Sequence, residues 1–214
     1  PGTAPSAPPL WPELQGFSLV LGGPLYQLFR KVHLEGDAVE VHLLRRVLVI
    51  CAVAWLPLLA LAVAGGAWLH GVEMPFLADI ETHVRFLLVV PLYIFAELIV
   101  HRRIRVIVVQ FVDRGLVPEA ALGRFRAALE GAIRWRNSIP AELVLIAAVY
   151  SLGVFIRGDV LVLDADSWYA RREHGAMTAT AAGHWLQWVS TPIMQFLLLR
   201  WYFRLVIWVR FLWH

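Results

Sequence analysis

Residues Trp185–Trp213 read WLQWVSTPIMQFLLLRWYFRLVIWVRFLW, an apolar stretch with no charged side chain before Arg200. As one helix rising about 1.5 Å per residue it would be roughly 43 Å long, which exceeds the roughly 30 Å hydrocarbon core of a bilayer. Its second half mixes arginines with Trp, Tyr and Phe, a composition that fits a membrane boundary. The stretch therefore predicts an integral membrane protein.

The composition of the whole chain agrees with this prediction. Of 214 residues, 59% are hydrophobic and 16% charged, whereas soluble domains carry about 25% charged residues. The net charge is +3, and the basic residues flank apolar segments instead of forming one continuous basic face. We therefore expect anionic lipid as a partner and no nucleic acid.

Four apolar segments predict four transmembrane helices within one helical domain, residues 16–214, so the expected fold class is an all-α integral membrane protein. The expected spans are residues 47–69, 85–105, 139–156 and 185–210. Pro91 and Pro192 predict kinks in the second and fourth spans. Residues 157–183 are expected to form a polar loop on the outer side.

The remaining segments do not span. Residues 1–15 are rich in Pro and Ala and predict a disordered arm, and the segment from residue 16 to 31 is too broken by Gly and Pro to cross, so it is interpreted as interfacial or re-entrant. Residues 118–137 place Leu and Phe on one helical face and arginines elsewhere. They predict a cytoplasmic amphipathic helix, either on the bilayer surface or packed under the bundle, with Ser138 capping the next span.

Most of the 19 Lys and Arg residues fall in segments that share one side of the predicted membrane, the side of Arg45 and Arg46. Because basic loops stay in the cytoplasm, the N-terminus and residue 214 are both expected to be cytoplasmic.

Two segments, FLADIETHVRFLLVVPLYI at Phe76–Ile94 and QFLLLRWYFRLVIWVRFLW at Gln195–Trp213, resemble parts of an uncharacterised family of bacterial multi-pass inner-membrane proteins. The resemblance covers most of Phe76–Trp213. It implies a bacterial inner-membrane location and carries no activity. Those relatives run on past this point, so we expect either that the natural chain continues beyond His214 or that another subunit covers this end.

Two carboxylates lie inside apolar spans. Glu97 ends the second span and Glu142 begins the third, so antiparallel packing would bring them to similar depth near the cytoplasmic face. A charged group at membrane depth costs roughly 2.5–3.5 kcal/mol and often faces an ion path. His101 lies four residues after Glu97, on the same helical face. Together these groups could bind a cation or relay a proton.

Simpler roles stay open for the same residues. Glu97 can pair with a nearby arginine, for which the candidates are Arg102, Arg103 and Arg136. Glu142 can complement the positive N-terminal end of its helix. Gln195, nearer mid-membrane, either bonds across helices or lines a polar path.

Arginines at the inner boundary are expected to reach lipid phosphate. These predicted lipid contacts are Arg102, Arg103, Arg200 and Arg204.

The outer boundary carries a possible metal site. Its candidate ligands are His70, His83, Asp79 and His184, which could hold Zn, Cu or Fe. Since they lack a compact spacing such as HxxxH, this site is a minor alternative, and no cofactor is predicted.

Three functions therefore compete. The preferred hypothesis is a homo-oligomeric channel or transporter subunit with an ion or proton path near Glu97 and Glu142. The first alternative is an accessory or scaffold subunit of a larger membrane complex, and the second is a metal or redox protein using the boundary histidines. No catalytic motif points to an enzyme.

Overall fold

The computed structural model describes residues 39–114, 118–160, 165–173 and 175–213. The predicted arm at residues 1–15 and the interfacial segment at 16–31 lie outside the described residues. The described chain is mostly helical.

The first described helix, α3 (Val39–Ala64), covers most of the first predicted span, residues 47–69. It begins before residue 47, because nothing in the sequence there breaks a helix. It ends before the predicted residue 69, because Gly66 adopts a φ of 68°. Glycine has no Cβ to oppose this left-handed conformation, so it ends the helix at little cost.

The second and fourth spans each contain a π-helical turn just before a proline. In the second, α4 (Ile80–His83), η2 (Val84–Val89) and α5 (Val90–Asp113) run on without a break, and the Val90 N–H donates to the Arg85 carbonyl, five residues back. In the fourth, α8 (Ala181–Trp185), η4 (Leu186–Ser190) and α9 (Thr191–Trp213) repeat this arrangement. Because proline has no N–H to donate and its ring crowds the preceding turn, the wider π turn accommodates Pro91 and Pro192 where kinks were predicted.

The third span and the amphipathic segment fold as two helices. A 3-10 turn η3 (Glu119–Ala121) leads into α6 (Leu122–Arg136), and α7 (Ile139–Val160) follows. Ser138 Oγ accepts from the Ala141 N–H at 3.3 Å, so the predicted cap is confirmed. The apolar face of α6 packs on Ile207 and Phe211 of α9. Of the two predicted arrangements, this contact agrees with a helix packed under the bundle and not with one lying free on the bilayer surface.

The all-α prediction is wrong in one place. The expected polar loop contains a hairpin of β1 (Ala170–Glu173) and β2 (Ala176–Ala179), with Ala170 opposite Ala179 and Gly175 at φ 84° in the turn. Four residues are too few for a two-residue period to stand out from a polar loop.

This hairpin is anchored to the helices through Trp168, which is only 1% exposed. Its Nε1 donates to Asp79 Oδ2 at 3.0 Å, and the Thr82 hydroxyl donates to the same oxygen at 2.7 Å. The other Asp79 oxygen accepts from the Thr82 N–H, which caps α4. The ring of Phe76, in the 3-10 turn η1 (Phe76–Ala78), meets Trp168 edge-on at 4.9 Å. The Asp79 carboxylate thus joins the start of α4 to Trp168, just before β1.

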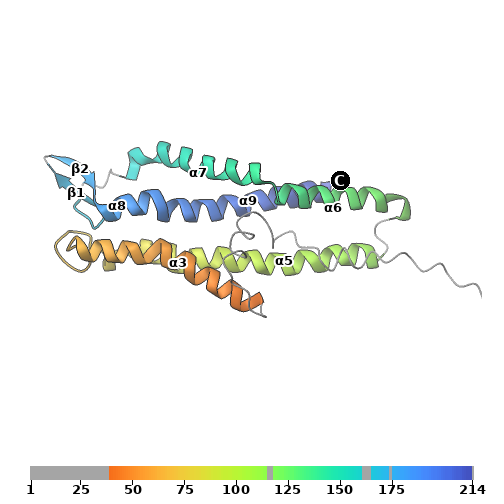
Figure 1. Ribbon diagram of the computed structural model, residues 1–214, viewed down its shortest axis with the longest axis horizontal. Coiled ribbons are helices and arrows are strands. Elements are labelled where there is room, and N and C mark those ends of the chain that lie inside the picture. The colour runs from red at the N-terminus through yellow and green to blue at the C-terminus, as the bar shows by residue number, and fades with distance from the viewer. Residues whose placement is uncertain (1–38, 115–117, 161–164, 174, 214) are drawn as a thin grey trace, which may run out of the picture.

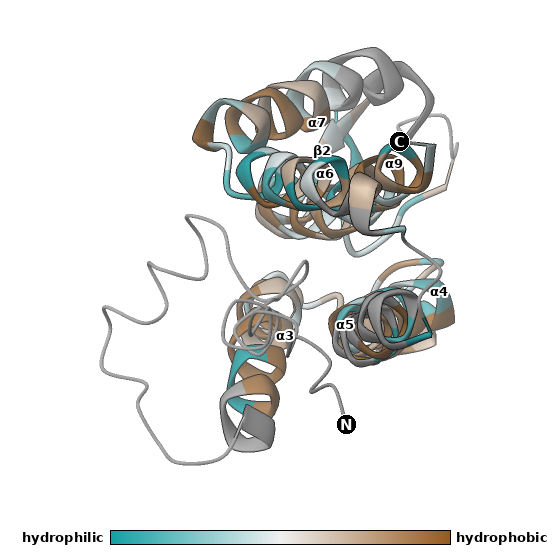
Figure 2. Ribbon diagram, turned by 90° about the vertical axis from the view of Figure 1, so that its right-hand side faces the viewer, coloured by the Kyte–Doolittle hydropathy of each residue, from teal (hydrophilic) through white to brown (hydrophobic). Residues whose placement is uncertain are grey.

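Figure 1 shows the hairpin at one end of an elongated bundle and α6 at the other, beside the C-terminal part of α9. In both views α7 lies on the far side of α9 from α3 and α5 (Figures 1 and 2). Brown, hydrophobic ribbon dominates α3 and α7, whereas teal gathers on α6 (Figure 2). The helix from α8 through α9 is therefore the central element, because α5, α6 and α7 pack on α9 and α3 packs on α8 and η4.

Two of the described helices are long and apolar enough to cross a membrane. They are Leu43–Ala64 in α3 and Ala181–Trp213, which joins α8, η4 and α9. Ile139–Ser151 in α7 is a shorter apolar helix.

Replacing Asp79 with Ala tests the anchor of the hairpin. Asp79→Ala removes a helix cap and a buried acceptor for Trp168, so we expect a loss of about 2–4 kcal/mol. The thermal midpoint in detergent should fall by several degrees, and proteolysis near Gly175 should accelerate. Asp79→Asn keeps one acceptor oxygen and should lose less. An unchanged thermal midpoint in Asp79→Ala would show that Asp79 does not anchor the hairpin.

Candidate functional site

A group of largely buried charges joins α5 to α9. Glu97 of α5 contacts two arginines of α9: Arg204 Nη1 pairs with Glu97 Oε1, and Arg200 Nη2 lies 3.5 Å from the same oxygen. The three side chains are only 11%, 13% and 6% exposed for Glu97, Arg204 and Arg200. Because Arg200 and Arg204 are four residues apart, one face of α9 presents both to the carboxylate.

Two further arginines surround this pair. Arg46 of α3 is close enough to act electrostatically on Glu97 and Arg204, and Arg136 at the end of α6 acts on Arg200. Burial lowers the pKa of the Arg136 guanidinium, and the positive charge of Arg200 lowers it further. We call Glu97, Arg46, Arg136, Arg200 and Arg204 the arginine cluster. Within the part of the chain that the structure describes, it brings four arginines near one carboxylate.

The cluster corrects two sequence predictions. Arg200 and Arg204 were expected at lipid phosphate, but both face Glu97 inside the bundle, because a buried carboxylate at this depth needs a counter-charge. The expected partners of Glu97 were arginines nearer in sequence or on α6, and the structure brings two from α9 instead. Arg103 is exposed on α5, and the side chains of His101 and Arg102 lie outside the described residues.

Glu142 is buried, at 8% exposed, in the first turn of α7. This position agrees with the alternative in which it complements the helix N-terminus. The packing does not bring Glu142 to Glu97 as predicted, because α9 lies between α5 and α7 (Figures 1 and 2).

A cavity of about 420 Å³, which we call the inner groove, opens between α3, α7 and α9. Apolar side chains make up most of its wall, and Arg46 and Arg200 also line it. On α3 and α9 these two arginines are the lining residues nearest the α6 end. The inner groove thus ends at the arginine cluster.

A second cavity, the outer cavity, lies between α7 and the α8–α9 helix and measures about 320 Å³. Gln195 lines it together with Gln187 and Thr191, and its two predicted roles, a polar lining and a bond across helices, stay predictions. The outer cavity and the inner groove share Tyr150 and Trp188 in their walls. There the Tyr150 hydroxyl donates to the Trp188 carbonyl at 3.3 Å, and the two rings stack 6.5 Å apart.

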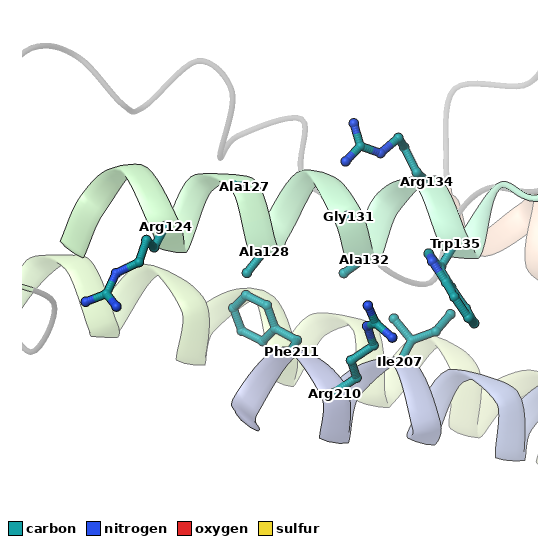
Figure 3. A pocket seen from close by; sticks show the side chains of 10 residues that line it. All are labelled: Arg124, Ala127, Ala128, Gly131, Ala132, Arg134, Trp135, Ile207, Arg210 and Phe211. Carbon is teal, nitrogen blue, oxygen red and sulfur yellow. The ribbon is translucent and has the colours of Figure 1, made fainter. Parts of the chain in front are cut away.

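A third pocket, of about 500 Å³, lies between α6 and α9 near the C-terminal end of the bundle. Figure 3 shows Arg210 reaching from α9 towards α6 beside Trp135. The Arg210 guanidinium lies 5.1 Å from the Trp135 ring centroid, a cation–π contact. With Arg124 also in the wall, this pocket makes the α6 end of the bundle positive.

The predicted metal site is not formed. Asp79 accepts from Trp168 and Thr82, and His83 Nδ1 accepts from Trp55 Nε1 at 3.0 Å. His70 and His184 are exposed. Among the residues that the structure describes, no group of three or more His, Cys, Asp or Glu side chains could hold a metal ion. Asp79 and His83 are therefore engaged in hydrogen bonds within the fold.

Sequence reasoning overlooked Arg46, Tyr150 and Trp188 as site residues. A signal for Arg46 was present, since Val49, Ile50 and Val53 follow at helical spacing and form the same wall of the inner groove. Arg46 was interpreted only as a marker of membrane orientation.

No protein-family model, curated protein or solved structure matches the chain. The resemblance of Phe76–Ile94 and Gln195–Trp213 to the bacterial inner-membrane family stays a prediction. Function is therefore argued from geometry alone.

A double-mutant cycle tests whether Glu97 and Arg204 depend on each other. Glu97→Gln leaves two buried arginines without their carboxylate and should cost about 3–5 kcal/mol in the free energy of unfolding. Adding Arg204→Gln to it removes one uncompensated charge and should restore part of that loss, as followed by denaturant unfolding in detergent. Arg103→Gln, at an exposed arginine of α5, should change stability little. Strictly additive losses would show that the pair is not coupled.

Proposed function

We propose that the chain is a multi-pass protein of a bacterial inner membrane and a subunit of a channel or transporter for an anionic solute. Its four spans would be α3, the helix from α4 through α5, α7, and the helix from α8 through α9. The hairpin would face outwards, and α6 the cytoplasm. The solute would pass along the seam between α7 and α9.

The exposure of the apolar helices supports the membrane assignment. In the most apolar windows of Leu43–Ala64 and Ala181–Trp213, only 22% and 17% of residues are buried. A core helix of a soluble protein would be mostly buried, whereas lipid covers exposed apolar side chains in a bilayer. This argument supports a bilayer as the surroundings of both helices.

The observation that carries the anion assignment is the gathering of four arginines near Glu97 among the residues that the structure describes: Arg46, Arg136, Arg200 and Arg204. Glu97 pairs with Arg204, and Arg200 lies 3.5 Å from it, so its carboxylate already has counter-charges and is a poor cation ligand. Guanidinium groups bind carboxylate and phosphate through charge-assisted hydrogen bonds, so we propose an anion path in place of the predicted cation or proton path.

The cavities support a route for that anion. The outer cavity and the inner groove both follow the seam of α7 and α9 and share Tyr150 and Trp188, whose contact lies between them. Separation of these two rings would connect the cavities. The pocket of Figure 3 adds positive charge at the cytoplasmic end, which raises the local anion concentration.

An accessory subunit remains the second candidate, because α9 carries exposed apolar side chains beyond Arg204. Val206, Val209 and Leu212 are each more than half exposed, and Trp213 is 86% exposed. Such a surface suits a partner helix. Native mass spectrometry of the protein purified from its own membrane distinguishes the two functions, since an accessory subunit retains a different polypeptide.

Anion flux into proteoliposomes tests the proposal. The wild-type protein should take up radiolabelled anions such as phosphate or acetate faster than empty liposomes, without a matching uptake of rubidium. Arg200→Gln removes an arginine of the cluster and should slow uptake about tenfold or more. Arg200→Lys keeps the charge and should retain part of the rate.

Arg103→Gln is the matched control, because it removes an exposed arginine and should leave the rate unchanged. Each variant is first shown to elute as the wild type does, so that a misfolded sample is not scored. Uptake of rubidium in preference to anions, or a wild-type rate in folded Arg200→Gln, would contradict an anion path through the cluster.

A further inference from the structure

We propose that the inner groove binds a single-chain anionic amphiphile, with its alkyl chain along α3, α7 and α9 and its headgroup between Arg46 and Arg200. This inference rests on the proposed function, because it names the class of anion that the cluster receives. A long-chain carboxylate has the required chemistry.

The wall of the groove favours an alkyl chain. Its described lining residues include Val49, Val53, Ile146 and Phe196, and no carboxylate is among them. Burying each CH₂ group of a chain against such a wall contributes favourable free energy, which a small hydrophilic anion cannot gain. The volume of about 420 Å³ falls within the roughly 300–1,000 Å³ of small-molecule sites and suits one chain better than two.

The charged end of the groove favours an anionic headgroup. Arg46 begins the α3 wall and Arg200 ends the α9 wall, so both guanidiniums belong to the same end. Arginine binds carboxylate and phosphate through paired N–H donors. At the opposite end Trp188 and Tyr150 are apolar rings stacked on each other. The groove therefore has a charged end and an apolar end, as the proposed ligand has.

The groove is also open to the surroundings of the bundle. Val49 and Val53 of α3 are 41% and 43% exposed, and Trp188 of η4 is 44% exposed. In the proposed membrane orientation this opening faces the lipid near the inner boundary. A membrane-dissolved amphiphile can thus reach the groove sideways, with its headgroup at the level where Arg side chains meet the interface.

Quenching of tryptophan fluorescence tests the site, because Trp188 lines the groove. The full chain is placed in nanodiscs of zwitterionic phosphatidylcholine and titrated with palmitate brominated in mid-chain. We expect saturable quenching, of which Trp188→Phe removes a substantial part. The brominated methyl ester has the same chain without the charge, and should bind about tenfold more weakly.

Two adjacent arginines give a matched pair of variants. Arg46→Gln removes a groove arginine and should weaken palmitate binding about tenfold, whereas Arg45→Gln, at an exposed neighbour, should not. If Arg46→Gln proves unstable, Val53→Phe narrows the groove and should reduce quenching. Its control is Val206→Phe, at an exposed position of α9 outside the groove.

Equal affinity for palmitate and its methyl ester, or equal weakening by Arg45→Gln and Arg46→Gln, would overturn the amphiphile site. So would quenching that Trp188→Phe leaves unchanged. Small-anion uptake together with absent palmitate binding would overturn this inference and leave the proposed function intact. Palmitate binding without any anion uptake would support the site and contradict the transport function.

Discussion

The contact of Glu97 with Arg200 and Arg204 is the constraint on which the rest of the bundle depends. It links α5 to α9, on which α6 and α7 also pack. An isolated carboxylate or guanidinium at this depth would be costly, and a pair that satisfies both is tolerated. The pair therefore fixes the rotation of α9, and with it the side of α9 that faces the inner groove.

That rotation connects structure to function. Once Arg200 faces Glu97, the residues three and four positions earlier, Leu197 and Phe196, line the groove towards α3 and α7. Arg46 reaches the same region from α3, so arginines from two helices meet where the groove ends. One structural ion pair thus leaves guanidinium groups at the end of an apolar groove, an arrangement that suits the proposed anion with an alkyl chain.

Local signals in the sequence predicted local structure well. Ser138 was predicted as a cap and accepts the expected N–H, and the apolar face of α6 was predicted from its spacing. The carboxylate Glu97 stood out because it interrupts an apolar run. Pro91 predicted a kink in its helix, and a π-helical turn just before it accommodates the proline. Each of these features depends on neighbours a few residues away.

Features that depend on distant residues could not be predicted in this way. Glu97 finds its partners a hundred residues later in the chain, and the sequence offered nearer arginines that were equally plausible. Trp168 anchors a short hairpin to Asp79 across a similar separation, so the hairpin had no local periodicity to reveal it. The groove arises from three helices, and no single segment of the sequence contains it.

The account depends most on a chain that crosses the membrane with the hairpin outside and α6 inside. The most direct measurement is labelling of single cysteines in intact cells with a membrane-impermeant thiol reagent, in a Cys51→Ala background. Ala176→Cys on the hairpin should be labelled in intact cells. Glu130→Cys on α6, also exposed, should be labelled only after permeabilisation. Equal labelling of both positions in intact cells would contradict the account.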